Sequence, residues 1–249
     1  MKTKTNRLYK DLAWLWPLWE DLEIYKKEST RIVKLIRKHS KIKTRSLLDM
    51  GCGGGKNAYH FKKHFRLTGI DVSKSMLRNA RKLNPECKFI IADMRKFDLK
   101  QKFDSVFIND AHNYMTTQAD LLKTFKMAYK HLQPGGIMLV HPDQTKETFQ
   151  QNSTHVWRSK RGDMDITFIE NNYDPDPKDN EYESTFVFLI RKKNRLKIEH
   201  DFHVGGLFGL SVWRKLLRKA GFRVYEEKED RTDSVATFAC VRALRSKLA

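Results

Sequence analysis

Residues 49–55 read Asp-Met-Gly-Cys-Gly-Gly-Gly and continue an apolar run that begins at Ser46. A buried strand that passes into glycines and then into a helical pattern is typical of the first turn of a nucleotide-binding α/β sheet. Glycines let the backbone approach a ligand where any side chain would collide with it. Because a glycine-rich turn also occurs for structural reasons alone, the interpretation depends on residues further along the chain.

Apolar runs alternate with helical patterns on both sides of this turn. We expect strands at 46–50, 67–71, 88–91, 103–109, 137–141, 222–227 and 234–241, with helices at 22–39 and 56–64 and further helices between the later strands. Such alternation indicates a parallel sheet covered by helices. The predicted fold class is therefore α/β, with a doubly wound, seven-stranded, mostly parallel sheet.

The alternation is interrupted after Pro142. Strand patterns at 164–170, 185–191 and 196–203 follow one another without a helix between them, so we expect them to pair antiparallel, as a small β insertion after the fifth strand. The prediction is one domain. Its parts are an N-terminal helical lid (1–44), a ligand-binding core (45–145), an antiparallel cap insertion (146–206) and a C-terminal helix with strands of the core sheet (207–249).

Three acidic residues indicate what the core binds. Asp71 ends the second strand about 20 residues after the glycines, where an acid can hold two ribose hydroxyls. A dinucleotide fingerprint needs glycine at the sixth position from Gly51, but Lys56 stands there. Asp49 suits a ligand with a cationic ammonium better than a pyrophosphate, and Asp93 is placed to accept a hydrogen bond from an adenine amino group. The three acids follow successive strands, at the edge where open α/β sheets bind ligands.

Together these motifs resemble those of the class I, Rossmann-like, S-adenosylmethionine (SAM)-dependent methyltransferases. The matching residues are 49–55, Asp71, 92–94, 103–104 and 134–136. The resemblance implies SAM as cofactor, with the glycine turn around its methionine part, the ribose on the acid of the second strand and the adenine beside Asp93 and Met94. An N-terminal tyrosine, Tyr25 or Tyr9, would reach the SAM carboxylate. The expected cofactor-binding residues are Tyr25, Asp49, Gly51, Cys52, Gly53, Gly55, Asp71, Val72, Asp93, Met94 and Asn109.

Residues 110–115 and the inserted strands are similar to a small-molecule branch that includes sugar-amine N-methyltransferases. This implies transfer of a methyl group to a nitrogen or oxygen of a small-molecule acceptor by in-line displacement. A hydroxyl acceptor would need a general base, whereas a neutral amine needs only a partner for its proton. The candidate catalytic residues are His112, Tyr114 and His203. Alternation places His200 on the face of its strand opposite to His203.

The charge leaves alternatives open. The 249 residues carry a formal net charge of +19, which makes nucleic acid a candidate partner. The basic residues are spread widely, with one local cluster at 191–197, and no aromatic-interleaved nucleic-acid motif accompanies them. The alternatives are an RNA methyltransferase that uses the basic surface, an NAD(P)-dependent oxidoreductase, and a non-catalytic SAM-binding protein. Lys56 weighs against the oxidoreductase.

Composition also bears on location and metals. The three cysteines lack metal-ligand spacing, so we expect no metal site and no disulfide framework. No apolar run is long enough for a membrane helix. The apolar stretch at 12–19 is short, broken by Pro17 and flanked by acids, which argues against a secretion signal. The expected location is cytoplasmic, and the sequence does not indicate an oligomeric state.

Overall fold

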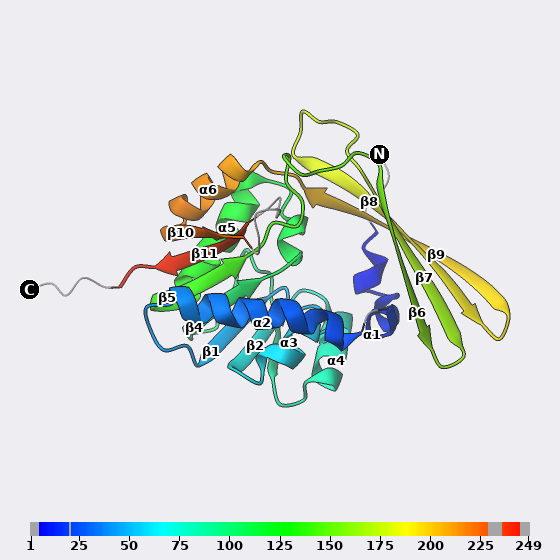
Figure 1. Cartoon of the computed structure of the whole chain (residues 1–249), viewed down its shortest axis with the longest axis horizontal. Coiled ribbons are helices and arrows are strands. Elements are labelled where there is room, and N and C mark those ends of the chain that lie inside the picture. The colour runs from blue at the N-terminus through cyan, green and yellow to red at the C-terminus, as the bar shows by residue number, and fades with distance from the viewer. Residues whose placement is uncertain (1–4, 20, 229–235, 245–249) are drawn as a thin grey trace, which may run out of the picture.

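The computed structural model describes residues 5–19, 21–228 and 236–244. It contains a seven-stranded sheet in the order β10-β11-β5-β4-β1-β2-β3 and a separate four-stranded sheet in the order β6-β7-β8-β9 (Figure 1). The seven strands are β1 (Ser46–Met50), β2 (Arg66–Asp71), β3 (Lys88–Ile91), β4 (Phe103–Ile108), β5 (Leu132–Val140), β10 (Phe222–Glu227) and β11 (Thr237–Arg242). Strands β1 to β5 pair parallel, and β11 runs antiparallel to both β5 and β10. The predicted α/β fold class is confirmed.

Helices cover both faces of the large sheet. They are α2 (Leu22–His39), α3 (Lys56–Phe61), α4 (Lys74–Leu83), α5 (Gln118–His131) and α6 (Leu210–Lys219). One buried cluster joins α2, α3 and α4 to the sheet, and a second joins α5 and α6 to its other face. In β1 every residue is buried, and Leu47 belongs to the first cluster while Leu48 belongs to the second. This is why the strand is an unbroken apolar run rather than an alternating one.

The helix starts follow local capping rules. The carboxylate of Asp21 accepts from the N–H of Glu23 at the start of α2, and the hydroxyl of Ser73 accepts from the N–H of Met76 at the start of α4. Such caps satisfy backbone N–H groups that have no partner inside the helix. Within the described ranges, none of the helices combines the length and the apolar character that crossing a membrane requires.

The four-stranded sheet consists of β6 (Ser153–Arg161), β7 (Met164–Tyr173), β8 (Glu181–Lys192) and β9 (Arg195–Gly206), all antiparallel. The three predicted strands correspond to β7, β8 and β9. Strand β6 was not expected, because its side chains are largely exposed and its sequence lacks an apolar alternation. The start of the predicted last strand, Ser234, lies outside the described residues, and β5 begins five residues before its predicted start.

The N-terminal segment (residues 5–19) lies between the two sheets (Figure 1). It contains the short helices η1 (Arg7–Tyr9), η2 (Ala13–Leu15) and α1 (Trp16–Trp19). A third apolar cluster joins its residues Leu8, Leu15 and Trp19 to Phe168 and Phe188 of the small sheet. The ring of Trp19 stacks on Phe168 with centroids 4.8 Å apart. The small sheet therefore holds the segment over the carboxyl ends of the large sheet.

Candidate active site

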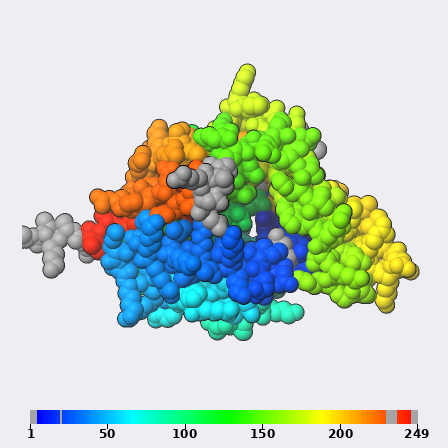
Figure 2. Space-filling view, in the orientation of Figure 1, coloured from blue at the N-terminus to red at the C-terminus, as the bar shows by residue number. Residues whose placement is uncertain are grey.

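A cavity of about 860 Å³ opens at the carboxyl ends of β1, β2 and β4, under the N-terminal segment. This is the size of a pocket for a cofactor together with a small acceptor. The space-filling view shows the surface hollowed where the N-terminal helices meet the small sheet (Figure 2). Ten of the eleven predicted cofactor residues line the cavity: Tyr25, Asp49, Gly51, Cys52, Gly53, Asp71, Val72, Asp93, Met94 and Asn109. The eleventh, Gly55, lies behind the turn, where its carbonyl accepts from Asn84 at 2.9 Å.

The glycine turn is fixed against β2. The N–H groups of Gly51 and Cys52 donate to the carbonyl of Ile70 at 2.8 and 3.0 Å, and the N–H of Gly53 donates to the Asp71 carboxylate at 2.9 Å. Gly51 has a φ of +82°, and a Cβ added there would collide with Ala111. Only glycine fits this position, because both the backbone angle and the close approach exclude a side chain.

Asp49 is a buried carboxylate at the cavity wall. It is 3% exposed, and its Oδ2 has no hydrogen-bond partner among the described residues. Burial, followed by the nearby charge of Asp71, raises the pKa of Asp49 to about 7. A cationic group bound in the cavity would stabilise the ionised form. The ammonium of the methionine part of SAM has the charge and hydrogen-bond donors that this carboxylate lacks, so the residues present fit the cofactor.

Asp71 and Asp93 lie further along the cavity. Asp71 accepts from the N–H groups of Gly53 and Ser73, which lower its pKa against the larger effect of burial, and the pKa remains raised. Its two oxygens keep lone pairs for ribose hydroxyls. Asp93 differs because it is paired with Arg95 at 2.6 Å, and this hydrogen bonding lowers its pKa. Asp93 is therefore already engaged at the edge of the cavity.

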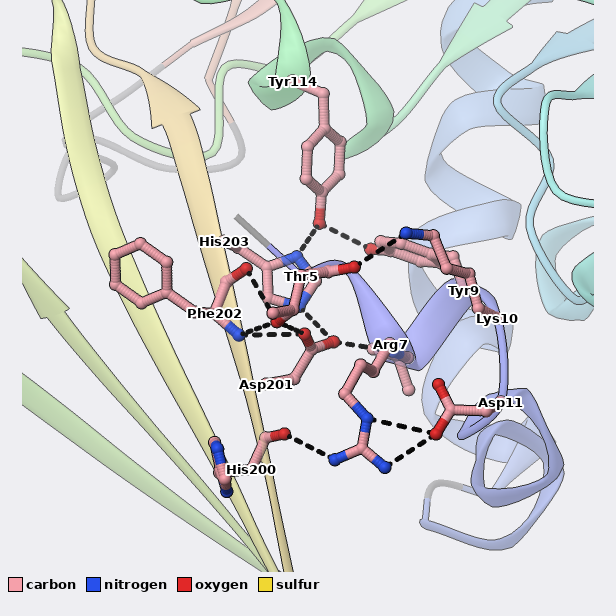
Figure 3. Close-up of polar contacts among 11 residues, drawn as sticks. Thr5, Arg7, Tyr9, Lys10, Asp11, Tyr114, His200, Asp201, Phe202 and His203 are labelled. Atoms are coloured by element: carbon pink, nitrogen blue, oxygen red, sulfur yellow. Dashed lines mark hydrogen bonds and ion pairs between the residues drawn. The ribbon is translucent and has the colours of Figure 1, made fainter. Parts of the chain in front are cut away.

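Four side chains form a hydrogen-bonded chain from the cavity into the protein (Figure 3). The hydroxyl oxygens of Tyr9 and Tyr114 are 2.8 Å apart, and the Tyr114 oxygen is 2.9 Å from Nδ1 of His203. Nε2 of His203 is 2.7 Å from the carboxylate of Asp201. The two tyrosines line the cavity, whereas His203 and Asp201 are 2% and 0% exposed behind them. The predicted residues Tyr114 and His203 are thus brought together.

His112, in contrast, does not line the cavity. Its ring packs edge-on against Trp213, with centroids 5.1 Å apart, and neither ring nitrogen has a hydrogen-bond partner among the described residues. Burial, followed by the charge of His141, lowers the pKa of His112 to about 3. The single turn η3 (Ala111–Tyr114) points Tyr114 into the cavity and His112 into the core, so the structure does not support His112 as a catalytic residue.

The sequence alone does not identify two of these four residues. It offers Tyr9 only as a ligand of the cofactor carboxylate, and it does not distinguish Asp201 from other acidic residues. The signal for Asp201 was its spacing of two from His203, which puts both side chains on one face of β9. No local sequence signal links Asp201 and His203 to Tyr9, because Tyr9 is almost 200 residues away in the sequence.

Two further lining residues carry unusual features. Lys56 is 4% exposed, and its ammonium lies 5.3 Å from the ring centroids of both Trp16 and Tyr25, within cation–π range. Asp110 has a φ of +48°, in the left-handed region that side chains rarely adopt. Both residues line the cavity beside the predicted cofactor residues.

Comparisons with known proteins agree with this geometry. Residues 47–136 match the family model described as a methyltransferase domain. The chain is 27% identical over 205 residues to the putative methyltransferase YqeM of Bacillus subtilis (strain 168), covering 76% of this chain and 77% of that protein. It is 36% identical over 127 residues to a dTDP-3-amino-3,4,6-trideoxy-alpha-D-glucopyranose N,N-dimethyltransferase of Streptomyces venezuelae. This second match spans about half of each protein (50% and 53%).

Solved structures show the same fold over nearly the whole chain. DesVI of Streptomyces venezuelae superposes with a TM-score of 0.81 at 24% identity, covering 98% of this chain and all of that one. SAM-bound CalS10, an amino pentose methyltransferase from Micromonospora echinaspora, superposes with a TM-score of 0.79 at 19% identity, covering 98% and 100%. None of these four proteins is named for nucleic acid or for hydride transfer, so the RNA and oxidoreductase alternatives gain no support.

The fold, the glycine turn, the Asp49 Oδ2 that has no partner in the part of the chain described, and the family match agree on the cofactor and on the class of reaction. The chain is an S-adenosylmethionine-dependent methyltransferase with the class I fold, similar to the sugar-amine N-methyltransferases.

Proposed function

We propose that the enzyme transfers the methyl group to the amino nitrogen of a small molecule, and that this acceptor is an amino sugar. The observation that carries the proposal is that one cavity holds both the predicted cofactor residues and the paired hydroxyls of Tyr9 and Tyr114. Neutral hydroxyls suit an amine, which needs a hydrogen-bond partner for its proton rather than a strong base. Two relatives bear the names of amino-sugar N,N-dimethyltransferases, which supports an amino sugar as the acceptor.

The cofactor half of the cavity is assigned by charge and position. Asp49 would hold the ammonium, Asp71 the ribose hydroxyls, and Asp93 with Met94 the adenine. Lys56 and Tyr25 would face the carboxylate. The turn residues Gly51, Cys52 and Gly53, together with Val72 and Asn109, would complete the contacts. When bound, SAM supplies a methyl group made electrophilic by the positively charged sulfonium.

The acceptor half lies under the N-terminal segment. Its lining includes Asn6, Tyr9 and Lys10 from that segment, and Tyr114 and Met115 from the turn after β4. These residues would orient the acceptor nitrogen and exclude water from the reacting atoms. Orientation and the exclusion of water are the main contributions that a protein makes to a methyl transfer of this kind.

A matched pair of acceptors tests the proposal. The enzyme is incubated with SAM and either dTDP-3-amino-3,6-dideoxy-α-D-glucose or its 3-hydroxy counterpart, and the products are analysed by mass spectrometry. We expect the amino sugar to gain the mass of one or two methyl groups, together with formation of S-adenosylhomocysteine, and the hydroxy sugar to remain unchanged. Methylation of the hydroxy sugar alone would refute N-transfer. Methylation of neither sugar, but of an amine from outside the sugars, would keep N-transfer and refute the acceptor class.

A further inference from the structure

The four hydrogen-bonded side chains at the cavity follow one another in a fixed order. From the cavity inward it runs Tyr9, Tyr114, His203, Asp201, with successive polar atoms 2.8, 2.9 and 2.7 Å apart (Figure 3). The four residues come from three separate elements, η1, η3 and β9. Each distance is within the range of a good hydrogen bond. The chain therefore connects the acceptor half of the cavity to a buried carboxylate without a gap.

Asp201 is held in the ionised form. It is fully buried, which raises its pKa, but hydrogen bonds from His203, from the hydroxyl of Thr5 and from the N–H of Leu8 outweigh burial and keep the pKa well below its usual value. The Thr5 and Leu8 contacts measure 2.5 and 2.6 Å. An ionised carboxylate only accepts hydrogen bonds, so Nε2 of His203 must carry a hydrogen. This fixes the ring orientation of His203, as carboxylates do for other functional histidines.

The hydrogen bonds between Tyr9, Tyr114 and His203 can run in either of two directions. The two arrangements differ by one proton on His203. When the ring is neutral, Nδ1 accepts from Tyr114, whose oxygen accepts from Tyr9, and the Tyr9 oxygen offers a lone pair to the cavity. When the ring is protonated, Nδ1 donates to Tyr114, which then donates to Tyr9. Passing one proton inward converts the first arrangement into the second. Burial raises the pKa of both phenols, so the tyrosines carry the proton as neutral hydroxyls.

We propose that Tyr9 is a catalytic residue that accepts the proton of the acceptor amine, and that Tyr114, His203 and Asp201 relay it to the imidazole. As the acceptor nitrogen forms its bond to the methyl carbon, the carbon–sulfur bond breaks and its electron pair stays on sulfur. The nitrogen's proton moves to the Tyr9 oxygen, the Tyr9 proton to Tyr114, and the Tyr114 proton to Nδ1 of His203. The inference rests on the proposed function, because it concerns the proton of an amine acceptor.

The same contacts connect the relay to the N-terminal segment. Thr5 and Leu8, which bind Asp201, and Tyr9, which begins the relay, all belong to that segment. The backbone N–H of Thr5 also donates to the carbonyl of Phe202, next to Asp201, at 3.0 Å. The same segment therefore completes the proton relay and lines the acceptor half of the cavity.

A purely structural role for the buried pair makes a different prediction. His203 packs on Phe186 of β8, with ring centroids 4.2 Å apart, so its loss would lower stability in any case. A structural role would reduce the rate by the same factor at every pH. The relay predicts a change in the pH profile. The titratable groups that face His203 are Asp201, Tyr114 and Tyr9, and those acting on the two hydroxyls from further away are Asp71, Asp110 and Tyr182.

The kinetic test uses Tyr114→Phe, which removes one hydroxyl, and His203→Gln, with His200→Gln as the matched control. His200 lies on the same strand and is exposed, and its backbone carbonyl accepts from Arg7, so the substitution leaves that contact in place. With dTDP-3-amino-3,6-dideoxy-α-D-glucose near neutral pH, we expect both relay variants to lose about 10²-fold in kcat, a usual effect for proton transfer. Their kcat should rise towards that of the wild type as pH rises, because hydroxide from the solvent then takes the proton that the interrupted relay cannot. The SAM affinity of both variants and the kcat of the control should stay unchanged. Equal losses at every pH would overturn the relay.

A second measurement needs no acceptor. Histidine labelled with ¹⁵N reports by NMR which ring nitrogen carries a hydrogen, and His203→Gln assigns the signal. In the SAM-bound enzyme under the assay conditions, we expect hydrogen on Nε2, which donates to Asp201, and none on Nδ1, which faces Tyr114. A hydrogen on Nδ1 would overturn the relay, because His203 could not then accept the proton. If the amino sugar is not methylated while Nδ1 is free, the proposed acceptor fails and the relay does not.

Discussion

Replacing Asp49 by asparagine removes the carboxylate assigned to the cofactor ammonium and keeps the shape of the side chain. In the ligand-free protein the pKa of Asp49 is about 7, raised by burial and then by Asp71. Only the ionised form pairs with an ammonium, so at about pH 6 roughly one carboxyl in ten is ready to bind. Affinity for SAM should therefore fall about tenfold from its plateau, or about 1.4 kcal/mol. Above about pH 8 the α-amino group itself loses its proton, so affinity should decline again.

Calorimetric titration with SAM across this pH range measures both the rise of affinity up to about pH 7 (the rising limb) and its decline above about pH 8. Asp49→Asn should bind SAM about 10- to 150-fold more weakly near neutral pH, the value of a hydrogen bond to a charged group, and should lose the rising limb below about pH 7. Asp11→Asn is the control, because Asp11 also lines the cavity but is exposed and paired with Arg7. Wild-type affinity that stays constant below pH 7, or a rising limb retained in Asp49→Asn, would refute the assignment.

The same variant has an opposite effect on stability. A carboxyl whose pKa is raised from about 4 in the unfolded chain to about 7 in the folded one stabilises the fold most below about pH 4, and this contribution is lost as pH rises through 7. The difference of about three pKa units corresponds to about 4 kcal/mol. Ligand-free Asp49→Asn should therefore be up to about 4 kcal/mol more stable at about pH 8 by urea unfolding. A variant that is less stable there would show that the ionised carboxylate of Asp49 does not destabilise the folded protein.

Three further predictions concern single positions. Asp71→Ala should weaken SAM binding at least tenfold, about 1.4 kcal/mol, by calorimetry, and an unchanged affinity in a folded variant would exclude the ribose role. Gly51→Ala should lower the free energy of unfolding by about 1–3 kcal/mol and abolish SAM binding, whereas Gly162→Ala, which has a positive φ but no neighbour within 4 Å, should cost stability alone. His112→Phe should keep its rate of methyl transfer, and loss of transfer would restore His112 as a catalytic candidate. The variant should also gain about 2 kcal/mol of stability at about pH 5. The neutral ring of the wild type stabilises the fold above about pH 6.5, and that stabilisation is lost on acidification.

The fold could be predicted because its information is local. The glycine turn at 51–55 and the apolar runs on either side of it specify strand, turn and helix without knowledge of distant contacts. Strand β6 escaped prediction because it lies at the edge of the small sheet and exposes most of its side chains. An edge strand with little buried surface leaves no alternation to read.

The site could be predicted only in part, for the same reason. The cofactor residues follow strand ends, so their clustering comes from the order of strands in the sheet. The residues of the relay cannot be found in this way. Tyr9 contacts Tyr114 across 105 positions of the sequence, and Thr5 contacts Asp201 across 196 positions. Whether His112 or Tyr114 enters the cavity depends on the direction in which one short turn points each side chain. The residue types alone do not determine that direction.

We assign the cavity as a SAM site built on Asp49 and Asp71. Parallel calorimetric titrations of the purified enzyme with SAM, S-adenosylhomocysteine and NADH test this assignment. We expect both adenosyl ligands to bind in the micromolar range, about −8 kcal/mol, and NADH not to bind. Binding of NADH alone, or the absence of SAM binding by protein shown to be free of copurified cofactor, would exclude a SAM site in this cavity.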